Sequence, residues 1–275
     1  MTREIQEIKE IQEIKSIKEK NPWKEVVKKY VDSEFLYSET NDFVCESDRE
    51  IIEAFNQKVD DEYKYHLNVP AYPWYGNPLK ANVIVLSLNP GYVEREVVIA
   101  KVIQNIEKQY SEGYTEHLRK MLTFDCDGFL PDDKGAHGMT YRDLANLHQS
   151  WYWWDRLNKA FVNNETGLTF EDVNSNFAVI QYIGYSSEKY SPFKSGVILP
   201  TQEYMKELIK YLLIHNQNVI FIVPRNVQKW NHILGNLWDD ERFIVSKDYL
   251  GQRFTKSILG EDAFNKVVKA FKSKI

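Results

Sequence analysis

The chain has 275 residues, of which 43% are hydrophobic and 27% charged, and its formal net charge is −5. Aromatic residues make up 14% of it, which excludes disorder over most of the length because such a composition supplies enough apolar surface for a core. Two cysteines are too few for a disulfide framework, a four-cysteine zinc site or an iron–sulfur cluster. No apolar run is long enough for a membrane span and no signal peptide is present, so we expect a cytoplasmic protein without membrane contact.

The first twenty residues differ in pattern from the rest. Isoleucine recurs at every third position from Ile5 to Ile17, between glutamate and lysine at helical spacing, which predicts a charged helix. A three-residue step turns backward by about 60° per repeat, so the isoleucines form no straight coiled-coil seam. We expect residues 1–20 to be a helical arm that docks partly on the body or on a second copy. The alternative is a specific dimerisation helix, which would make a homo-oligomer.

Residues 21–275 are predicted to form one α/β domain, with a sheet core at about 81–257 and a helical insertion at about 95–165. Apolar runs predict four strands, and a helix with Thr201 as its N-cap follows the second of them. The strands are 81–88, 177–183, 219–223 and 242–245. Strands that alternate with helices favour a three-layer α/β/α sandwich around a central, mostly parallel four-stranded sheet.

In such sheets a ligand binds beyond the carboxyl ends of the strands. The residues that follow the strands lie at 89–95, 185–194, 224–229 and 246–256, and they contain more basic than acidic side chains. The basic ones are Arg95, Lys189, Lys194, Arg225, Lys229, Lys247, Arg253 and Lys256; the acidic ones are Glu94, Glu188 and Asp248. This local excess suits a phosphate-bearing ligand, although lysine is also common on loops.

Aromatic side chains are interleaved with these charges. Tyr92 or Phe193 would supply a flat face for a flipped or single-stranded base. The aromatic block 151–154 lies in a helical pattern and is instead expected to pack in the core. The acidic loop 125–133 lacks the spacing of an EF-hand, so we predict no metal site.

The segment Leu86-Ser87-Leu88-Asn89-Pro90-Gly91-Tyr92 resembles the first motif of the uracil-DNA glycosylase superfamily, in its Asn-Pro-Gly form. The chain is most similar to divergent bacterial members, which carry Tyr-x-Ser after the second strand, here Tyr185-Ser186-Ser187. The resemblance implies that Asn89 orients the water that attacks the sugar carbon and that no cofactor is needed. Base contacts are expected from Tyr92, Tyr185, Ser186 and Phe193, and phosphate contacts from Arg95, Lys194, Arg225 and Arg253, because these residues follow the predicted strands.

Two departures from the family pattern weaken the expected chemistry. Ser87 stands where the family has glycine, and the second-motif segment 246–249 contains no histidine. In active members of the family this histidine donates a hydrogen bond to the base anion as it leaves. Loss of one such donor typically costs about 3 kcal/mol of transition-state stabilisation. Lys247 lies in this segment and is the candidate to replace the histidine as a cationic donor to the departing base. Asn89 cannot act as a general base, because an amide takes no proton from water, so the expected activity is slow.

The sequence therefore predicts a uracil-DNA glycosylase-like hydrolase of N-glycosidic bonds, a DNA-binding protein of base-excision DNA repair. The alternative is a non-catalytic module that binds a nucleic acid or a nucleotide on the same fold. A third interpretation is an interaction protein that assembles through the isoleucine-rich helix.

Overall fold

Five short strands form one sheet in the computed structural model, which describes residues 3–33, 40, 42–91, 116, 118–129, 150–194, 196–247 and 253–273. The strand order is β1 (Trp74–Gly76), β3 (Phe177–Gln181), β2 (Val83–Ser87), β4 (Ile220–Val223) and β5 (Phe243–Val245). β2 pairs in parallel with β3 and β4, and β4 pairs in parallel with β5. The chain is thus a mixed α/β protein with a mostly parallel sheet, as the sequence predicts.

The first strand is a finding that the sequence did not predict. β1 pairs antiparallel with β3, with Tyr75 opposite Val179. It has only three residues and lies in a stretch rich in proline and tyrosine, so it lacks the apolar β-branched run that marks the other strands. It ends at Gly76, where φ is +72° and a Cβ atom would lie 2.6 Å from the carbonyl oxygen of Phe177. Only glycine fits there without strain.

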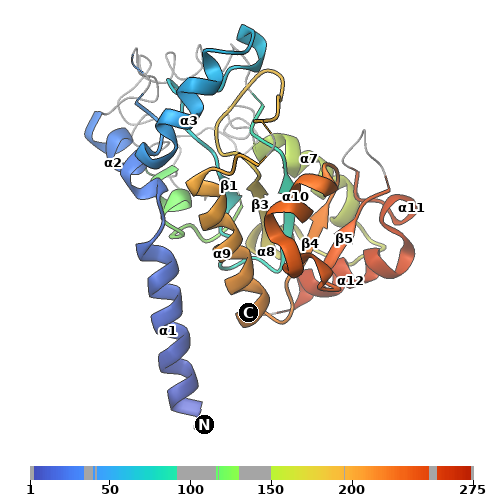
Figure 1. The fold of residues 1–275 in the computed structure, drawn as a ribbon. Helices are drawn as coiled ribbons and strands as arrows, with labels where there is room; N and C mark the ends of the chain where they lie inside the picture. Colours follow the sequence, from blue (N-terminus) through green and yellow to red (C-terminus); the bar gives the residue numbers. More distant parts are fainter. Residues whose placement is uncertain are drawn as a thin grey trace, which may run out of the picture.

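Helices surround the sheet (Figure 1). In chain order they are α1 (Arg3–Glu19), α2 (Trp23–Ser33), α3 (Glu46–Asn56), α7 (Ser150–Phe161), α8 (Phe170–Asn176), α9 (Pro200–His215), α10 (Val227–Leu234), α11 (Lys256–Leu259) and α12 (Glu261–Lys272), with 3-10 turns η1 (Asp61–Tyr63) and η3 (Gly235–Asp239). α12 packs on β2, β4 and α8, while α9 packs against α1, α3 and α10. No helix in the described ranges is long and apolar enough to cross a membrane.

One hydrophobic core joins these elements, from Ile17 to Phe271. Every residue of β2, β3 and β4 is buried, whereas β5 is a partly exposed edge strand. Trp153 and Trp154 of α7 are buried, which confirms core packing for these two members of the aromatic block.

The start of α9 corrects one local prediction. Leu199 is its N-cap, so Thr201 lies inside the helix. Thr201 donates from its backbone N to Asp48 Oδ1 (3.2 Å) and from its hydroxyl to Asp48 Oδ2 (2.6 Å). A side chain far away in sequence therefore caps this helix end, which a local sequence pattern cannot reveal.

The helix α1 stands out from the body of the protein (Figure 1). Its last turns contact α9: Ile17 is buried, and the Tyr204 hydroxyl donates to the Ile17 carbonyl oxygen (3.0 Å). Glu13 forms an ion pair with His215 at the end of α9. Ile11, two residues before Glu13, is 65% exposed, and these contacts with the body come from the second half of this helix.

Candidate functional site

The loops after β2 and β3 run side by side at the carboxyl edge of the sheet. Backbone hydrogen bonds continue beyond the strands, from Tyr182 N to Ser87 O (3.0 Å), from Ile183 N to Leu88 O (2.9 Å) and from Ser187 N to Pro90 O (3.3 Å). Parallel pairing brings the ends of β4 and β5 to the same edge. This edge is the expected ligand position in a parallel sheet.

Asn89 is held in one orientation at this edge. Its Nδ2 donates to Ser187 Oγ (2.8 Å) and to the Pro90 carbonyl oxygen (3.0 Å). A carbonyl oxygen can only accept, so the contact with Pro90 identifies which end of the amide is the nitrogen. No donor from the described residues reaches Oδ1. The half-buried amide therefore offers an oriented acceptor to a water molecule or a ligand.

Ser187 and Gln181 are two site residues that the sequence prediction omitted. Ser187 belongs to the Tyr-x-Ser segment and is the only partner of Asn89 from another loop among the described residues. Gln181 pairs with Ser87, two residues before Asn89, and is 2% exposed. Its Oε1 is buried and accepts no hydrogen bond within the described chain. A signal for Gln181 was present, because it is the polar residue that closes the apolar run of β3.

A buried acceptor without a donor is a costly arrangement. Leaving one unpaired typically costs about 1–3 kcal/mol, so such groups are uncommon in folded proteins and often serve function. Gln181 lies at the end of β3 in register with Ser87, two residues before Asn89, and its unpaired Oε1 would accept a hydrogen bond from an N–H group. Asn89 with Ser187, and Gln181 on the next strand, are the chemical centre of the candidate site.

Tyr185 is a correction to the predicted base-binding set. Its side chain is fully buried, its hydroxyl donates to Asp48 Oδ2 (2.9 Å) and accepts from Cys45 N (3.2 Å). Its ring packs against Trp23 with centroids 5.3 Å apart. Burial leaves no open ring face for a base, and it raises the pKa of the Tyr185 hydroxyl. Tyr185 thus anchors the loop after β3 to α2 and to the start of α3.

The other predicted base contacts have different surroundings. Ser186 is buried, and its carbonyl oxygen accepts from His66 N (2.8 Å). Phe193 is partly buried between Phe55 and Tyr65, with ring centroids at 4.8 and 5.7 Å. Its ring already packs edge-to-face on Phe55 and tilted against Tyr65, so it shapes the site more than it presents a free surface. Tyr92 lies outside the described residues.

The predicted basic excess is smaller than the sequence suggests. Lys189 pairs with Glu62 (2.5 Å) and Lys256 pairs with Glu165, and both acids come from segments that follow no strand of the sheet. Lys229 lies 4.8 Å above the ring of Tyr190, and burial lowers its pKa.

Among the predicted phosphate contacts, Lys194 and Arg253 are exposed and have no acidic partner in the described chain. Arg225 is half-buried at the end of β4, and Arg95 lies outside the described residues. Lys247 is exposed after β5, with β4 between its strand and β2. Two strand spacings amount to about 10 Å, so the structure does not bring Lys247 into contact with Asn89.

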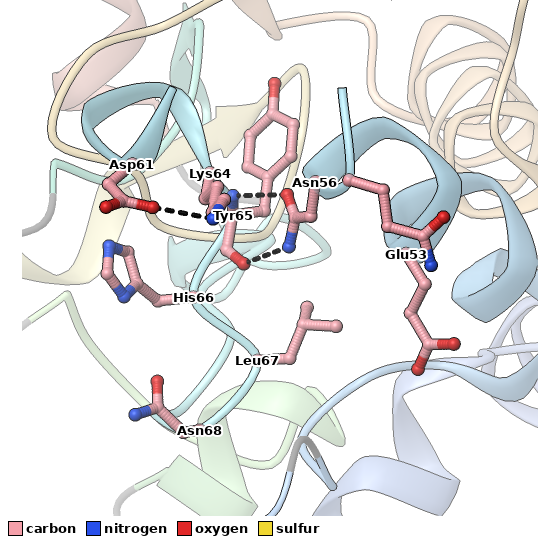
Figure 2. Close-up of a pocket in the computed structure, with 9 residues that line it drawn as sticks. Glu53, Asn56, Asp61, Lys64, Tyr65, His66, Leu67 and Asn68 are labelled. Carbon is pink, nitrogen blue, oxygen red and sulfur yellow. Dashed lines mark hydrogen bonds and ion pairs between the residues drawn. The ribbon is translucent and has the colours of Figure 1, made fainter. Parts of the chain in front are cut away.

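A cavity of about 720 Å³ lies beside the loop after β3 (Figure 2). Its walls come from the end of α3, from η1 and from the segment that follows: Glu53, Asn56, Gln57, Asp61, Lys64, Tyr65, His66, Leu67 and Asn68. Asn56 fixes this segment through two 2.8 Å hydrogen bonds with the backbone of Tyr65. The His66–Ser186 pairing brings a histidine beside the loop, and burial lowers the pKa of its ring.

Metal binding has no support in the described part of the chain, where no group of three His, Cys, Asp or Glu side chains could hold an ion. No protein-family model matches the chain, and neither a curated protein nor a solved structure matches it. The assignment of function therefore depends on the residues at the carboxyl edge.

Proposed function

We propose that the protein is a uracil-DNA glycosylase-like hydrolase that cleaves N-glycosidic bonds in DNA, on a three-layer α/β/α sandwich, in base excision. The observation that carries the proposal is the Asn89 amide, fixed by Ser187 and Pro90 with Oδ1 left to accept a hydrogen bond. Its place at the carboxyl end of a central parallel strand agrees with the resemblance of the 86–92 segment.

The proposed reaction consumes only water. Asn89 Oδ1 accepts a hydrogen bond from the water, whose oxygen forms a bond to the sugar C1′ atom. The bond between C1′ and the base nitrogen breaks, its electron pair leaves with the base, and the water's proton passes to solvent. Gln181 Oε1 accepts from an N–H on the edge of the base, which selects a base with a donor there. Lys194, Arg225 and Arg253 contact phosphates.

A second candidate, a module that binds nucleic acid or a nucleotide without cleaving it, is favoured by one observation. The residue expected to stabilise the departing base, Lys247, is exposed and two strands away from β2. A base anion that leaves without a nearby donor leaves slowly. The two candidates share the binding surface and differ in turnover.

The test is base release from uracil-containing single-stranded DNA and from a mismatched duplex. Asn89→Ala should lower the single-turnover rate at least about a hundredfold, because the water loses its orienting acceptor. Ser187→Ala should lower the rate about tenfold with little change in binding, because the amide loses one of its two anchors. Asn158→Ala, on the exposed surface of α7, is the matched control and should leave the rate unchanged.

Each outcome separates the candidates. Release by the wild type but not by Asn89→Ala supports the hydrolase and its key residue together. DNA binding without release by any variant rejects the hydrolase and leaves the binding module. A protein that neither binds DNA nor releases a base rejects the hydrolase and a DNA-binding module.

A further inference from the structure

The sequence of α1 is self-complementary about its central residue, Ile11. When two copies of residues 3–19 are laid antiparallel with Ile11 opposite Ile11, Ile8 comes opposite Ile14 on the same face of the helix. That face also forms two charged pairs of opposite sign on each side of the centre, Glu4 with Lys18 and Glu7 with Lys15. The parallel arrangement in the same register would place each charge opposite its own copy.

The position of α1 in the fold leaves it open to a second chain. Figure 1 shows its N-terminal end clear of the other labelled elements. Ile11 is 65% exposed, and Ile214 in the last turn of α9 is 61% exposed. Lys15, at 74% side-chain exposure, remains accessible to a partner charge beside its ion pair with Glu19 (3.8 Å). Lys18 has 37% side-chain exposure and pairs with Asp125 (3.3 Å).

A helix of this length gains most of its stability from packing against other elements. It spans about 25 Å, and a 17-residue helix in water is only marginally stable without tertiary packing. Its second half has that packing on α9. The three-residue isoleucine step excludes a long coiled coil but allows a short crossing.

We propose that α1 is the interface of a two-fold symmetric homodimer, in which two α1 helices pair antiparallel and cross at Ile11. The occupant of the exposed face around Ile11 is then a second copy of this chain. A two-fold axis through Ile11 places the first half of each helix alongside the second half of the other, which is itself docked on α9. This isologous arrangement forms the Glu4–Lys18 and Glu7–Lys15 pairs twice.

The experiment uses charge reversal in the full chain and reads the mass by sedimentation equilibrium. Glu4→Lys with Glu7→Lys should raise the dimer dissociation constant at least about tenfold, because four attractive pairs become repulsive. Lys15→Glu with Lys18→Glu should do the same. Mixing the two variants should restore a dimer as tight as that of the wild type, because the heterodimer regains opposite signs at all four positions. Glu50→Lys with Glu171→Lys, away from α1, is the control of equal charge change.

Three results would overturn the proposal. One is a wild-type chain that stays monomeric over the whole concentration range. Another is a dimer that neither charge reversal weakens. The third is a dimer that both reversals weaken but that mixing does not restore, because this excludes the antiparallel register. Restoration on mixing also shows that both variants fold, so loss of structure cannot imitate the expected result.

Discussion

Asp48 is the residue that connects the candidate site to the rest of the fold. Its carboxylate accepts hydrogen bonds from Thr201 and from Tyr185, so α3, α9 and the loop after β3 meet at one group. The side chain is fully buried. Burial raises the pKa of Asp48, although its hydrogen bonds oppose the shift. The loop that positions Ser187, and through it Asn89, therefore depends on a buried titratable group.

Asp48→Asn should change both the stability and its pH dependence. The folded-state pKa lies above the unfolded value, so the native state holds the proton more tightly and stability falls as pH rises through that interval. Asparagine removes this fall. Its amide N–H₂ group also faces hydroxyl and backbone donors that it cannot accept from, which should lower the free energy of unfolding by about 1–3 kcal/mol. Urea unfolding between pH 4 and pH 8 measures both effects. The control is Asp239→Asn on the surface, which should keep the pH dependence of the wild type. If Asp48→Asn keeps it as well, the prediction is wrong.

At the scale of elements, the loop after β3 is positioned by close contact with the start of α2. Gly184 lies against the ring of Trp23, which is fully buried, and its carbonyl oxygen accepts from Tyr72 N (2.8 Å). A Cβ atom at this position would lie 2.6 Å from Trp23 Cη2 and 3.1 Å from Pro73 Cα. The glycine is therefore required by the close approach of helix, loop and strand.

Gly184→Ala should destabilise the protein by about 1–3 kcal/mol, because the core around Trp23 is already full. Trp23→Phe creates space on its own and is destabilising for the opposite reason. In the double variant the new methyl group should fill part of that space. The double variant should thus lose less free energy of unfolding than the sum of the single ones, as measured by urea titration. Additive losses would show that the two residues do not compete for the same volume.

For the molecule as a whole, charge is unevenly distributed and partly neutralised by the fold. The net charge is −5, yet Lys194, Lys247 and Arg253 lie exposed near the carboxyl edge without acidic partners in the described ranges. Lys189 and Lys256, by contrast, are paired with acids. An anionic strand would meet a local positive surface on an acidic body, so its binding should be weak and strongly salt-dependent.

The salt dependence of single-stranded DNA binding tests this distribution. Lys194→Ala with Arg253→Ala should make the slope of log K against log salt concentration shallower by about 0.7 for each phosphate that the protein no longer neutralises. Lys28→Ala with Lys269→Ala removes two exposed lysines elsewhere and should leave the slope unchanged. Fluorescence anisotropy at several salt concentrations gives both slopes. Equal slopes in the two double variants would show that the strand binds elsewhere or by general charge alone.

The sequence by itself determined the local elements, because their periodicity is written in consecutive residues. The apolar runs of β2, β3 and β4 and the amphipathic pattern of α12 predict buried strands and a packed helix, and Asn89 is recognisable from its immediate neighbours. Tertiary structure decided what those residues meet. The contact between Asn89 and Ser187 joins residues 98 positions apart, and Thr201 meets Asp48 across 153.

The same reason explains β1, the burial of Tyr185 and the pairing of Lys189 with Glu62. Each depends on which segments lie side by side once the strands have paired, and no local pattern encodes that arrangement. Gln181 is the intermediate case. Its polarity at the end of an apolar run is visible in the sequence, but only the register with Ser87 places it on the strand next to the one that leads to Asn89, because pairing in a sheet aligns residues that are distant along the chain.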